Sequence, residues 1–251
     1  MNLNDKNVVV TGGSRGLGLG LVEALVEQGA KVTVVARGAD ALATVHDRLG
    51  VATIAADVAD ESAAHRIVAE LRPEILVLNA GAKPPMDRLD KVSWADFSAT
   101  WETDVKAGLY WLQAALNVPL APGSRVLVSS SGAAVNGSPL SGGYAGAKRM
   151  LWVMAGYANG VSQQRNLGIR FQTIVPRQMV AGTGVGDAGA AGYARAQGIE
   201  PAQFLARFPV MTPREYGDKV VAVLVDPQYA EGFALGINGE AGVTIIEKVA
   251  A

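Results

Sequence analysis

The chain has 251 residues, enough to bury one large hydrophobic core. It carries 22 basic and 23 acidic residues, and no long run of one sign occurs. This balance does not favour nucleic acid or an anionic membrane as a partner. The sequence has no cysteine, so disulfides are excluded, and its two histidines, His46 and His65, lie apart. We therefore expect no metal site.

Residues 1–7 are polar and precede only a short apolar run, so they do not resemble the apolar core of a signal peptide. No stretch approaches the roughly eighteen unbroken apolar residues of a membrane span. We expect a soluble, cytoplasmic protein.

Short β-branched runs alternate with longer amphipathic stretches along the chain. The predicted strands are 8–11, 31–36, 52–56, 75–78, 125–129, 169–175 and 233–237. The predicted helices are 16–28, 40–49, 61–71, 96–117, 143–163 and 213–225. This alternation predicts an α/β fold, with a doubly wound, mostly parallel sheet of seven strands covered by helices on both faces. No composition break marks a second domain, so residues 1–251 are expected to form one.

Residues 181–210 interrupt the alternation with an insertion rich in glycine and alanine. The insertion carries Tyr193, Phe204 and Phe208. Because long insertions between a strand and a helix are often lids, we predict a lid at about 181–210.

The first predicted strand leads directly into TGGSRGLGLG, residues 11–20. Gly12, Gly16 and Gly18 have the spacing T-G-x-x-x-G-x-G at a strand-to-helix turn. Missing side chains there let a pyrophosphate approach backbone N–H groups at the positive end of a helix. Such a cluster can also be only a tight turn. The turn has no lysine, which excludes the phosphate loop of a nucleoside triphosphatase.

The end of the second predicted strand bears on cofactor choice. Folds that prefer NAD place a carboxylate there, but Ala36 occupies the position and Arg37 follows. A guanidinium matches the geometry of a phosphate, and Arg15 in the glycine turn could approach the same group. Either arginine alone could be a solvated side chain. Together they predict a preference for NADP(H), with NAD(H) possible.

Further motifs follow in a fixed order: LNAG at 78–81, Ser131, Tyr144 and Lys148. With the glycine turn, they make the chain resemble a short-chain dehydrogenase/reductase over almost its whole length. The resemblance implies a Rossmann fold and an NAD(P)-dependent enzyme that interconverts a carbonyl and a secondary alcohol. Tyr-x-x-x-Lys alone is common, but with a serine thirteen residues earlier it is specific.

Tyr144 and Lys148 would share one face of a helix, because residues i and i+4 are neighbours there. A free phenol is a weak acid with a pKa near 10, and a nearby ammonium favours its anion. In the family, the tyrosine is the general acid/base, the lysine also bonds the nicotinamide ribose, and the serine steadies the substrate oxygen. Taken singly, each residue could serve only packing, solvation or a loop cap.

The motifs and the resemblance together predict a set of cofactor-binding residues. These are Gly12, Ser14, Arg15, Gly16, Leu17, Gly18, Arg37, Asp57, Val58, Asn79, Ala80, Gly81, Tyr144, Lys148, Pro176 and Met179. Asp57 matches an acid that contacts adenine, or it caps the next helix. Asn79 to Gly81 line the nucleotide cleft in the family, or they form a simple turn.

Three positions depart from the family pattern. Asp104 stands where a fourth catalytic residue, asparagine, is common, and a carboxylate only accepts hydrogen bonds. It could hold a relay water, support the charge of Lys148, or be structural. Arg177 replaces a glycine after Pro176, where it could face solvent or bind an acidic substrate group. GINGEAG at 236–242 replaces a frequent Asp-Gly-Gly, so this edge could pack differently.

The substrate is poorly encoded. The insertion and the loop 132–140 are largely apolar, which favours a medium-sized ketone or alcohol, although apolar lids also merely exclude water. A noncatalytic NADP(H)-binding sensor on the same fold is the alternative, but it would be expected to lose the serine, tyrosine or lysine. Relatives imply a homotetramer or homodimer. Trp101, Tyr110, Trp111 and Trp152 could anchor such an interface or pack in the core.

Overall fold

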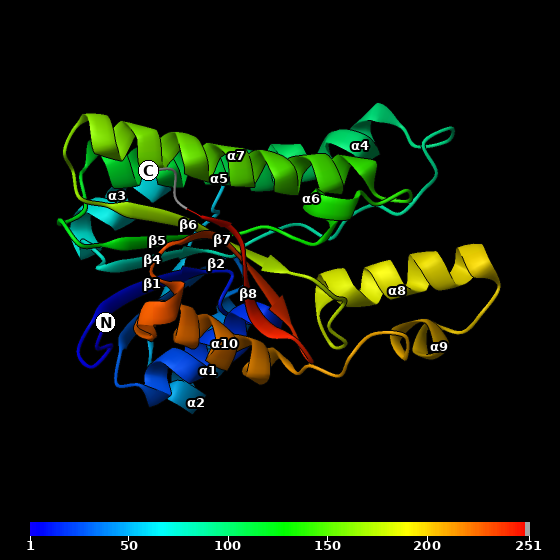
Figure 1. Cartoon of the computed structure of the whole chain (residues 1–251), viewed down its shortest axis with the longest axis horizontal. Coiled ribbons are helices and arrows are strands. Elements are labelled where there is room, and N and C mark those ends of the chain that lie inside the picture. Colours follow the sequence, from blue (N-terminus) through cyan, green and yellow to red (C-terminus); the bar gives the residue numbers. More distant parts are fainter. Residues whose placement is uncertain (249–251) are drawn as a thin grey trace.

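The β-branched runs form one sheet of eight strands in the computed structural model, which describes residues 1–248 (Figure 1). The strand order is β3-β2-β1-β4-β5-β6-β7-β8, with only β8 antiparallel to its neighbour. The strands are β1 (Asn7–Thr11), β2 (Lys31–Ala36), β3 (Ala52–Ala55), β4 (Ile75–Leu78), β5 (Arg125–Ser129), β6 (Arg170–Pro176), β7 (Gly232–Asn238) and β8 (Gly242–Lys248). The predicted α/β, doubly wound class is confirmed.

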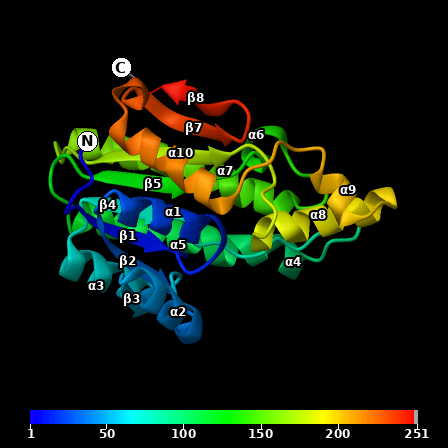
Figure 2. The ribbon, with the colours of Figure 1, turned by 90° about the horizontal axis from the view of Figure 1, so that it is seen from below.

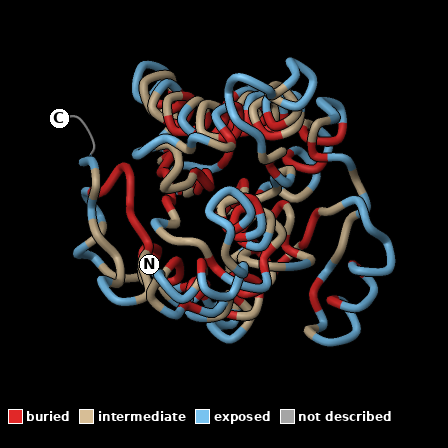
Figure 3. The backbone as a smooth tube through the Cα atoms, turned by 90° about the vertical axis from the view of Figure 1, so that its right-hand side faces the viewer, coloured by how far each residue is buried: buried red, intermediate tan, exposed pale blue. Residues whose placement is uncertain are grey.

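Helices cover both faces of the sheet (Figures 1 and 2). One layer holds α3 (Glu61–Leu71), α5 (Lys106–Asn117) and α7 (Gly142–Gln164). The other holds α1 (Gly16–Glu27), α2 (Ala39–Leu49) and α10 (Pro213–Val225). Figure 3 shows the buried backbone segments concentrated between exposed outer surfaces.

The strands are apolar on both sides, because each side packs against a helical layer. In β1, Val9 joins the core beneath α3, α5 and α7, while Val8 and Val10 join the core beneath α1, α2 and α10. In β4, Leu76 and Ile75 divide in the same way. The continuous valine and leucine runs in the sequence follow from this two-sided burial.

The prediction of seven strands is wrong by one. Residues after the GINGEAG turn form β8, which pairs antiparallel with β7 from Asn238↔Gly242 to Gly232↔Lys248. β8 is rich in β-branched residues, and its burial pattern is only intermediate to exposed, as expected of a strand at a sheet edge.

The helix predicted over 96–117 is interrupted by a wider turn. The structure has α4 (Trp94–Thr100), a π-helical turn (Trp101–Val105) and then α5. Ser93 begins α4 by accepting a hydrogen bond from the backbone N–H of Asp96 at 3.1 Å. Such π-helical turns occur frequently at functional sites, and this one contains Asp104.

The insertion at 181–210 contains α8 (Gly184–Gln197) and α9 (Pro201–Leu205), which we call the α8–α9 segment. The segment projects beyond the sheet on the side where α4 and the short α6 (Ala133–Asn136) lie (Figures 1 and 2). It has a small core of its own, in which Ala190, Ala194 and Phe204 are buried. A short 3₁₀ helix, Pro227–Tyr229, follows α10.

The crossing of α1 and α10 depends on two glycines. A Cβ on Gly20 would lie 1.9 Å from the Pro213 carbonyl oxygen, and one on Gly217 would lie 2.2 Å from the Gly20 oxygen. We expect Gly20→Ala to lower the free energy of unfolding by about 1–3 kcal/mol, because the helices must separate. Denaturant unfolding measures this. Gly160→Ala in α7 is the control, since nothing lies within 4 Å of its added Cβ. An equal effect of both changes would contradict the crossing argument.

Candidate active site

A cleft of about 670 Å³ opens at the carboxyl ends of the parallel strands. This is where open α/β sheets bind ligands, and the volume suits a small-molecule or cofactor site. The structure brings together sixteen of the eighteen predicted site residues as lining of this cleft. They are Gly12, Ser14, Arg15, Gly16, Leu17, Gly18, Arg37, Val58, Asn79, Ala80, Gly81, Ser131, Tyr144, Lys148, Pro176 and Met179. Asp57 and Asp104 are not among the lining residues.

The glycine turn has the backbone that its sequence requires. Gly12 and Gly16 have φ angles of +68° and +55°, which side chains rarely adopt. A Cβ on Gly18 would lie 2.2 Å from the Gly12 oxygen. Arg15 precedes α1 and makes no side-chain cap. The first amides of α1 thus have no side-chain cap and face the cleft beside glycine, so the turn fits a pyrophosphate.

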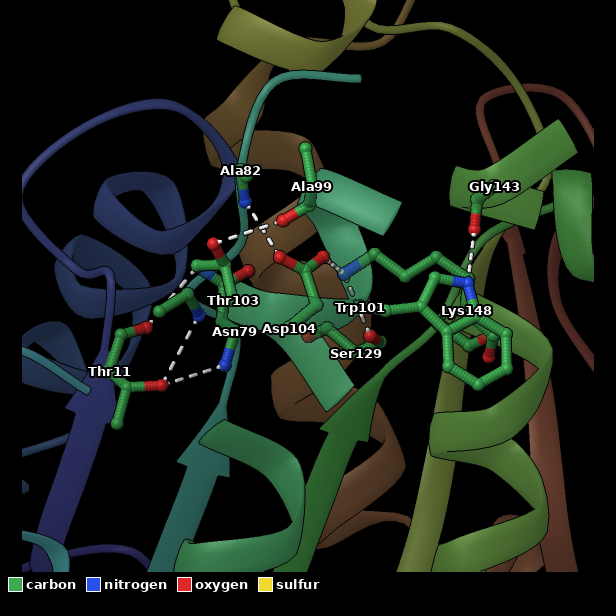
Figure 4. Close-up of polar contacts among 12 residues, drawn as sticks. Thr11, Asn79, Ala82, Ala99, Trp101, Thr103, Asp104, Ser129, Gly143 and Lys148 are labelled. Atoms are coloured by element: carbon green, nitrogen blue, oxygen red, sulfur yellow. Dashed lines mark hydrogen bonds and ion pairs between the residues drawn. The ribbon is translucent and has the colours of Figure 1, made fainter. Parts of the chain in front are cut away.

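Asn79 ties the turn after β4 to the end of β1 (Figure 4). Its backbone N–H donates to Thr11 Oγ1 at 3.0 Å, and its side-chain amide donates to the carbonyls of Thr11 and Gly12 at 3.4 and 3.3 Å. Thr11 Oγ1 in turn donates to the Val77 carbonyl at 3.2 Å. These bonds hold two sides of the cleft in fixed register.

Asp57 lies in the turn after β3, where its Oδ1 accepts a hydrogen bond from Ala59 N–H at 3.0 Å. The next residue, Val58, lines the cleft, and its carbonyl accepts a hydrogen bond from Trp111 Nε1 at 3.0 Å. The Asp57 carboxylate therefore has a turn-stabilising bond, and its contact with adenine stays a prediction.

Tyr144 and Lys148 lie one turn apart near the start of α7, and only 8% and 5% of their surfaces are exposed. Lys148 Nζ lies 5.7 Å from the centre of the Tyr144 ring and 3.5 Å from the Ser129 carbonyl oxygen. The helix can lie this close to α4 because Gly143 has no side chain. A Cβ there would be 1.9 Å from the Phe97 oxygen.

Ser131 lies two residues beyond the end of β5 and lines the cleft. Its Oγ accepts a hydrogen bond from Ala133 N–H at 3.2 Å. Because a hydroxyl both donates and accepts, this bond leaves the Ser131 proton available to an oxygen in the cleft.

Asp104 lies beside the ammonium group of Lys148 (Figure 4). The Asp104 side chain is fully buried, and its Oδ2 lies 2.9 Å from Lys148 Nζ. Its Oδ1 accepts a hydrogen bond from Ala82 N–H at 2.8 Å. Burial disfavours the charged ammonium, but the Asp104 carboxylate, together with Tyr144, more than offsets this, so the pKa of Lys148 is raised above its ordinary value. Of the three roles left open for Asp104, the contacts favour support of the Lys148 charge.

A Cβ on Gly81 would lie 2.8 Å from Asp104 Oδ2 and 3.2 Å from Lys148 Nζ. The glycine of the LNAG motif is therefore required by the buried ion pair as well as by the cleft.

Sequence reasoning missed several residues that line the cleft, among them Tyr216, Lys83 and Thr183. Tyr216 comes from α10 and is 1% exposed. Burial raises the pKa of its hydroxyl, and a hydrogen bond with Ser129 opposes the shift in part. No local pattern marks Tyr216, because it reaches the cleft only through the packing of α10. Lys83 lies two residues after the LNAG motif, and this closeness to the motif was the signal that could have identified it as a cleft residue.

Within residues 1–248, no helix combines the length and the apolar character needed to cross a bilayer.

Residues 6–186 match the family model described as short chain dehydrogenase. The match covers most of the chain and includes the glycine turn, Ser131, Tyr144 and Lys148. The chain therefore belongs to the short-chain dehydrogenase/reductase family, as the resemblance predicted.

Curated relatives include three oxidoreductases with partial coverage. The short chain dehydrogenase/reductase AacuD of Aspergillus aculeatus is 31% identical over 59% of this chain and 55% of its own length. The sorbitol dehydrogenase of Cereibacter sphaeroides is 29% identical over 59% of this chain and 61% of its own. The NADPH-dependent pterin aldehyde reductase of Arabidopsis thaliana is 30% identical over 63% of this chain and 69% of its own. The chain thus spans little more than half the length of the first two.

Proposed function

We propose that this protein is an NADP(H)-dependent oxidoreductase that interconverts a carbonyl and a secondary alcohol. One observation carries the proposal: Ser131, Tyr144 and Lys148 line the same cleft as the glycine turn. The relatives named above, a sorbitol dehydrogenase and a pterin aldehyde reductase among them, support oxidoreduction of this general kind.

Each residue has a role that follows from its chemistry. The Tyr144 hydroxyl gives its proton to the substrate oxygen in reduction and takes one back in oxidation. The Ser131 hydroxyl donates a hydrogen bond that orients the same oxygen. Lys148 places a positive charge beside the phenol, and Asp104 holds that charge in position. When bound, the cofactor supplies or accepts the hydride.

The preference for NADP(H) rests on the charge at the far end of the cleft. Arg15 and Arg37 both line the cleft, together with Ala36, at the position where an acid would select NAD. Two guanidinium groups can bind a 2′-phosphate, whereas neither gains from a 2′-hydroxyl to the same extent.

Arg37→Ala is expected to weaken NADPH binding by about tenfold or more, because a charge-assisted hydrogen bond contributes about 1.5–3 kcal/mol. NADH binding should change little. Fluorescence titration of both nucleotides measures the ratio. Lys31→Ala, a cation at the opposite end of β2, is the control and should leave the ratio unchanged. Equal weakening of NADPH and NADH by Arg37→Ala would contradict a phosphate contact.

A panel of ketones, aldehydes and secondary alcohols, followed by NADPH and NADH absorbance in parallel, tests the proposed function. Turnover with NADPH is the expected result. Tight NADPH binding without turnover of any compound would instead support the noncatalytic sensor.

We further propose that the α8–α9 segment closes the cleft as a lid. We also propose that copies of the chain assemble as a homotetramer or homodimer. Trp111 and Trp152 are buried within the protomer, whereas Trp94 is 77% exposed. Trp101 is partly exposed, and its Nε1–H donates to the Gly143 carbonyl at 2.9 Å. Light scattering tests the assembly. A cytoplasmic location stays a prediction.

A further inference from the structure

Three hydroxyls form a hydrogen-bonded chain in the lining of the cleft, and we call them the hydroxyl cluster: Ser138, Ser141 and Tyr193. Ser138 Oγ lies 2.7 Å from Tyr193 Oη and 2.6 Å from Ser141 Oγ. Ser138 and Ser141 belong to the segment between α6 and α7, and Tyr193 belongs to α8. The cluster therefore joins the α8–α9 segment to the start of α7, the helix that carries Tyr144 and Lys148.

The hydrogen bonds of the cluster leave capacity for a ligand. Three hydroxyls supply three protons, and the two bonds among them use two. Within residues 1–248, these three oxygens make no other side-chain hydrogen bond. One O–H and several lone pairs thus remain available to an oxygen in the cleft.

The surroundings of the cluster are apolar. Met86, Phe204 and Phe208 also line the cleft, and the Tyr193 ring stacks on Phe204 with centroids 5.5 Å apart. The centroids of the Phe204 and Phe208 rings are 5.7 Å apart. A polar ligand group that enters this region without a partner would lose its hydration at a cost, so the cluster is where such a group gains most.

Two nearby polar side chains have other contacts. The Gln178 amide donates to the Pro209 carbonyl and accepts from Gly239 N–H. Arg177 is exposed, and its stem packs against β7, where a Cβ on Gly236 would lie 2.7 Å from Arg177 Cδ. Arg177 and Lys83 also line the cleft, but the hydroxyl cluster is a neutral group there and matches a neutral oxygen.

We propose that the hydroxyl cluster binds a second, neutral oxygen of the substrate, so that the protein selects ketones with a hydroxyl or carbonyl close to the reacting carbon and an apolar remainder. Ser141 directly precedes α7 and Tyr144 is the third residue of that helix, so the cluster lies at the end of α7 that carries Tyr144. This placement favours a second oxygen close to the reacting carbonyl. This inference rests on the proposed oxidoreductase function.

Two matched ketones test the selection: a methyl ketone with an apolar chain, and the same ketone with a hydroxyl on the adjacent carbon. The unaltered protein should show a kcat/KM at least about tenfold higher for the hydroxyketone than for the methyl ketone. This is the difference expected when only one of the two ketones makes a hydrogen bond in a desolvated site. Tyr193→Phe and Ser138→Ala should each reduce this ratio severalfold. Tyr157→Phe is the matched control, because Tyr157 is 68% exposed on α7, and it should keep the ratio.

A binding measurement separates this inference from the proposed function. A diol with an apolar chain should raise the melting temperature of the NADPH-loaded protein more than the matched monoalcohol, which lacks one hydroxyl. Tyr193→Phe should remove this difference. Equal kcat/KM values for both ketones together with equal melting shifts would overturn the inference. So would a Tyr193→Phe variant that slows both ketones by the same factor. A diol-specific shift without reduction of either ketone would support the binding site and refute the proposed oxidoreductase.

Discussion

Tyr144→Phe is expected to lower kcat/KM for carbonyl reduction by about 10²–10⁴-fold, the range that a positioned general acid contributes. The change removes one oxygen and keeps the buried ring, so packing of α7 should persist. Steady-state kinetics measures the loss. Circular dichroism and NADPH titration should show that fold and cofactor binding are retained.

Tyr157→Phe serves as the control for this substitution as well, since it removes the same atom from the exposed side of the same helix. It should leave kcat/KM within about twofold of the unaltered protein, as surface changes usually do. Substantial residual turnover in Tyr144→Phe would mean that another group protonates the substrate oxygen. Tyr216, the second buried tyrosine of the cleft, would then be the first residue to test.

Asp104→Ala is expected to lower the free energy of unfolding by about 3–5 kcal/mol, because it leaves the buried Lys148 ammonium without its partner. Denaturant unfolding at neutral pH measures the loss. Glu102→Ala lies in the same π-helical turn but at an exposed position, and it should change stability by no more than about 0.5 kcal/mol. A small effect of Asp104→Ala would mean that the ion pair contributes little.

The pH dependence of the pair has a definite sign. The pKa of Lys148 is raised above the ordinary 10.5, so the stabilisation is fully present below that pH and is lost as pH rises through the folded value. Asp104→Asn keeps an acceptor for Ala82 N–H but removes the charge. Without that charge, burial should bring the pKa of Lys148 below its value in the unaltered protein.

The Asp104→Asn variant should therefore lose stability and activity at a lower pH than the unaltered protein does on the alkaline side. Unfolding and kcat/KM measured across the alkaline range test this. Because a purely structural role would lower stability equally at every pH, an unchanged pH profile would contradict support of the Lys148 charge.

Much of the fold could be predicted because its sequence pattern has a physical cause. Strands buried on both faces must be apolar throughout, as Val8 to Val10 show, and a phosphate turn must have glycines where the backbone requires them. The strand that was missed, β8, lies beyond a turn that was interpreted only as a departure from a family motif. The β-branched residues of β8, Val243 to Ile246, were the available signal.

The parts that could not be predicted depend on contacts between distant segments. Nothing local to Asp104 shows that its carboxylate meets Lys148, because the π-helical turn and α7 come together only through packing. The hydrogen bond between Ser138 and Tyr193 likewise joins two segments that lie far apart in the sequence. Motif spacing predicts which residues share a turn of helix, but it does not predict how two elements meet.

The antiparallel strand at the end of the described chain has a consequence for handling the protein. β7 is almost wholly buried and apolar, and β8 is the element that hydrogen-bonds its outer side. A version shortened before Gly242 would present β7 as a bare edge of unpaired amides and carbonyls, which is a template for joining other chains. The β8 strand thus protects solubility, and a fusion or truncation should keep Gly242 to Lys248 intact.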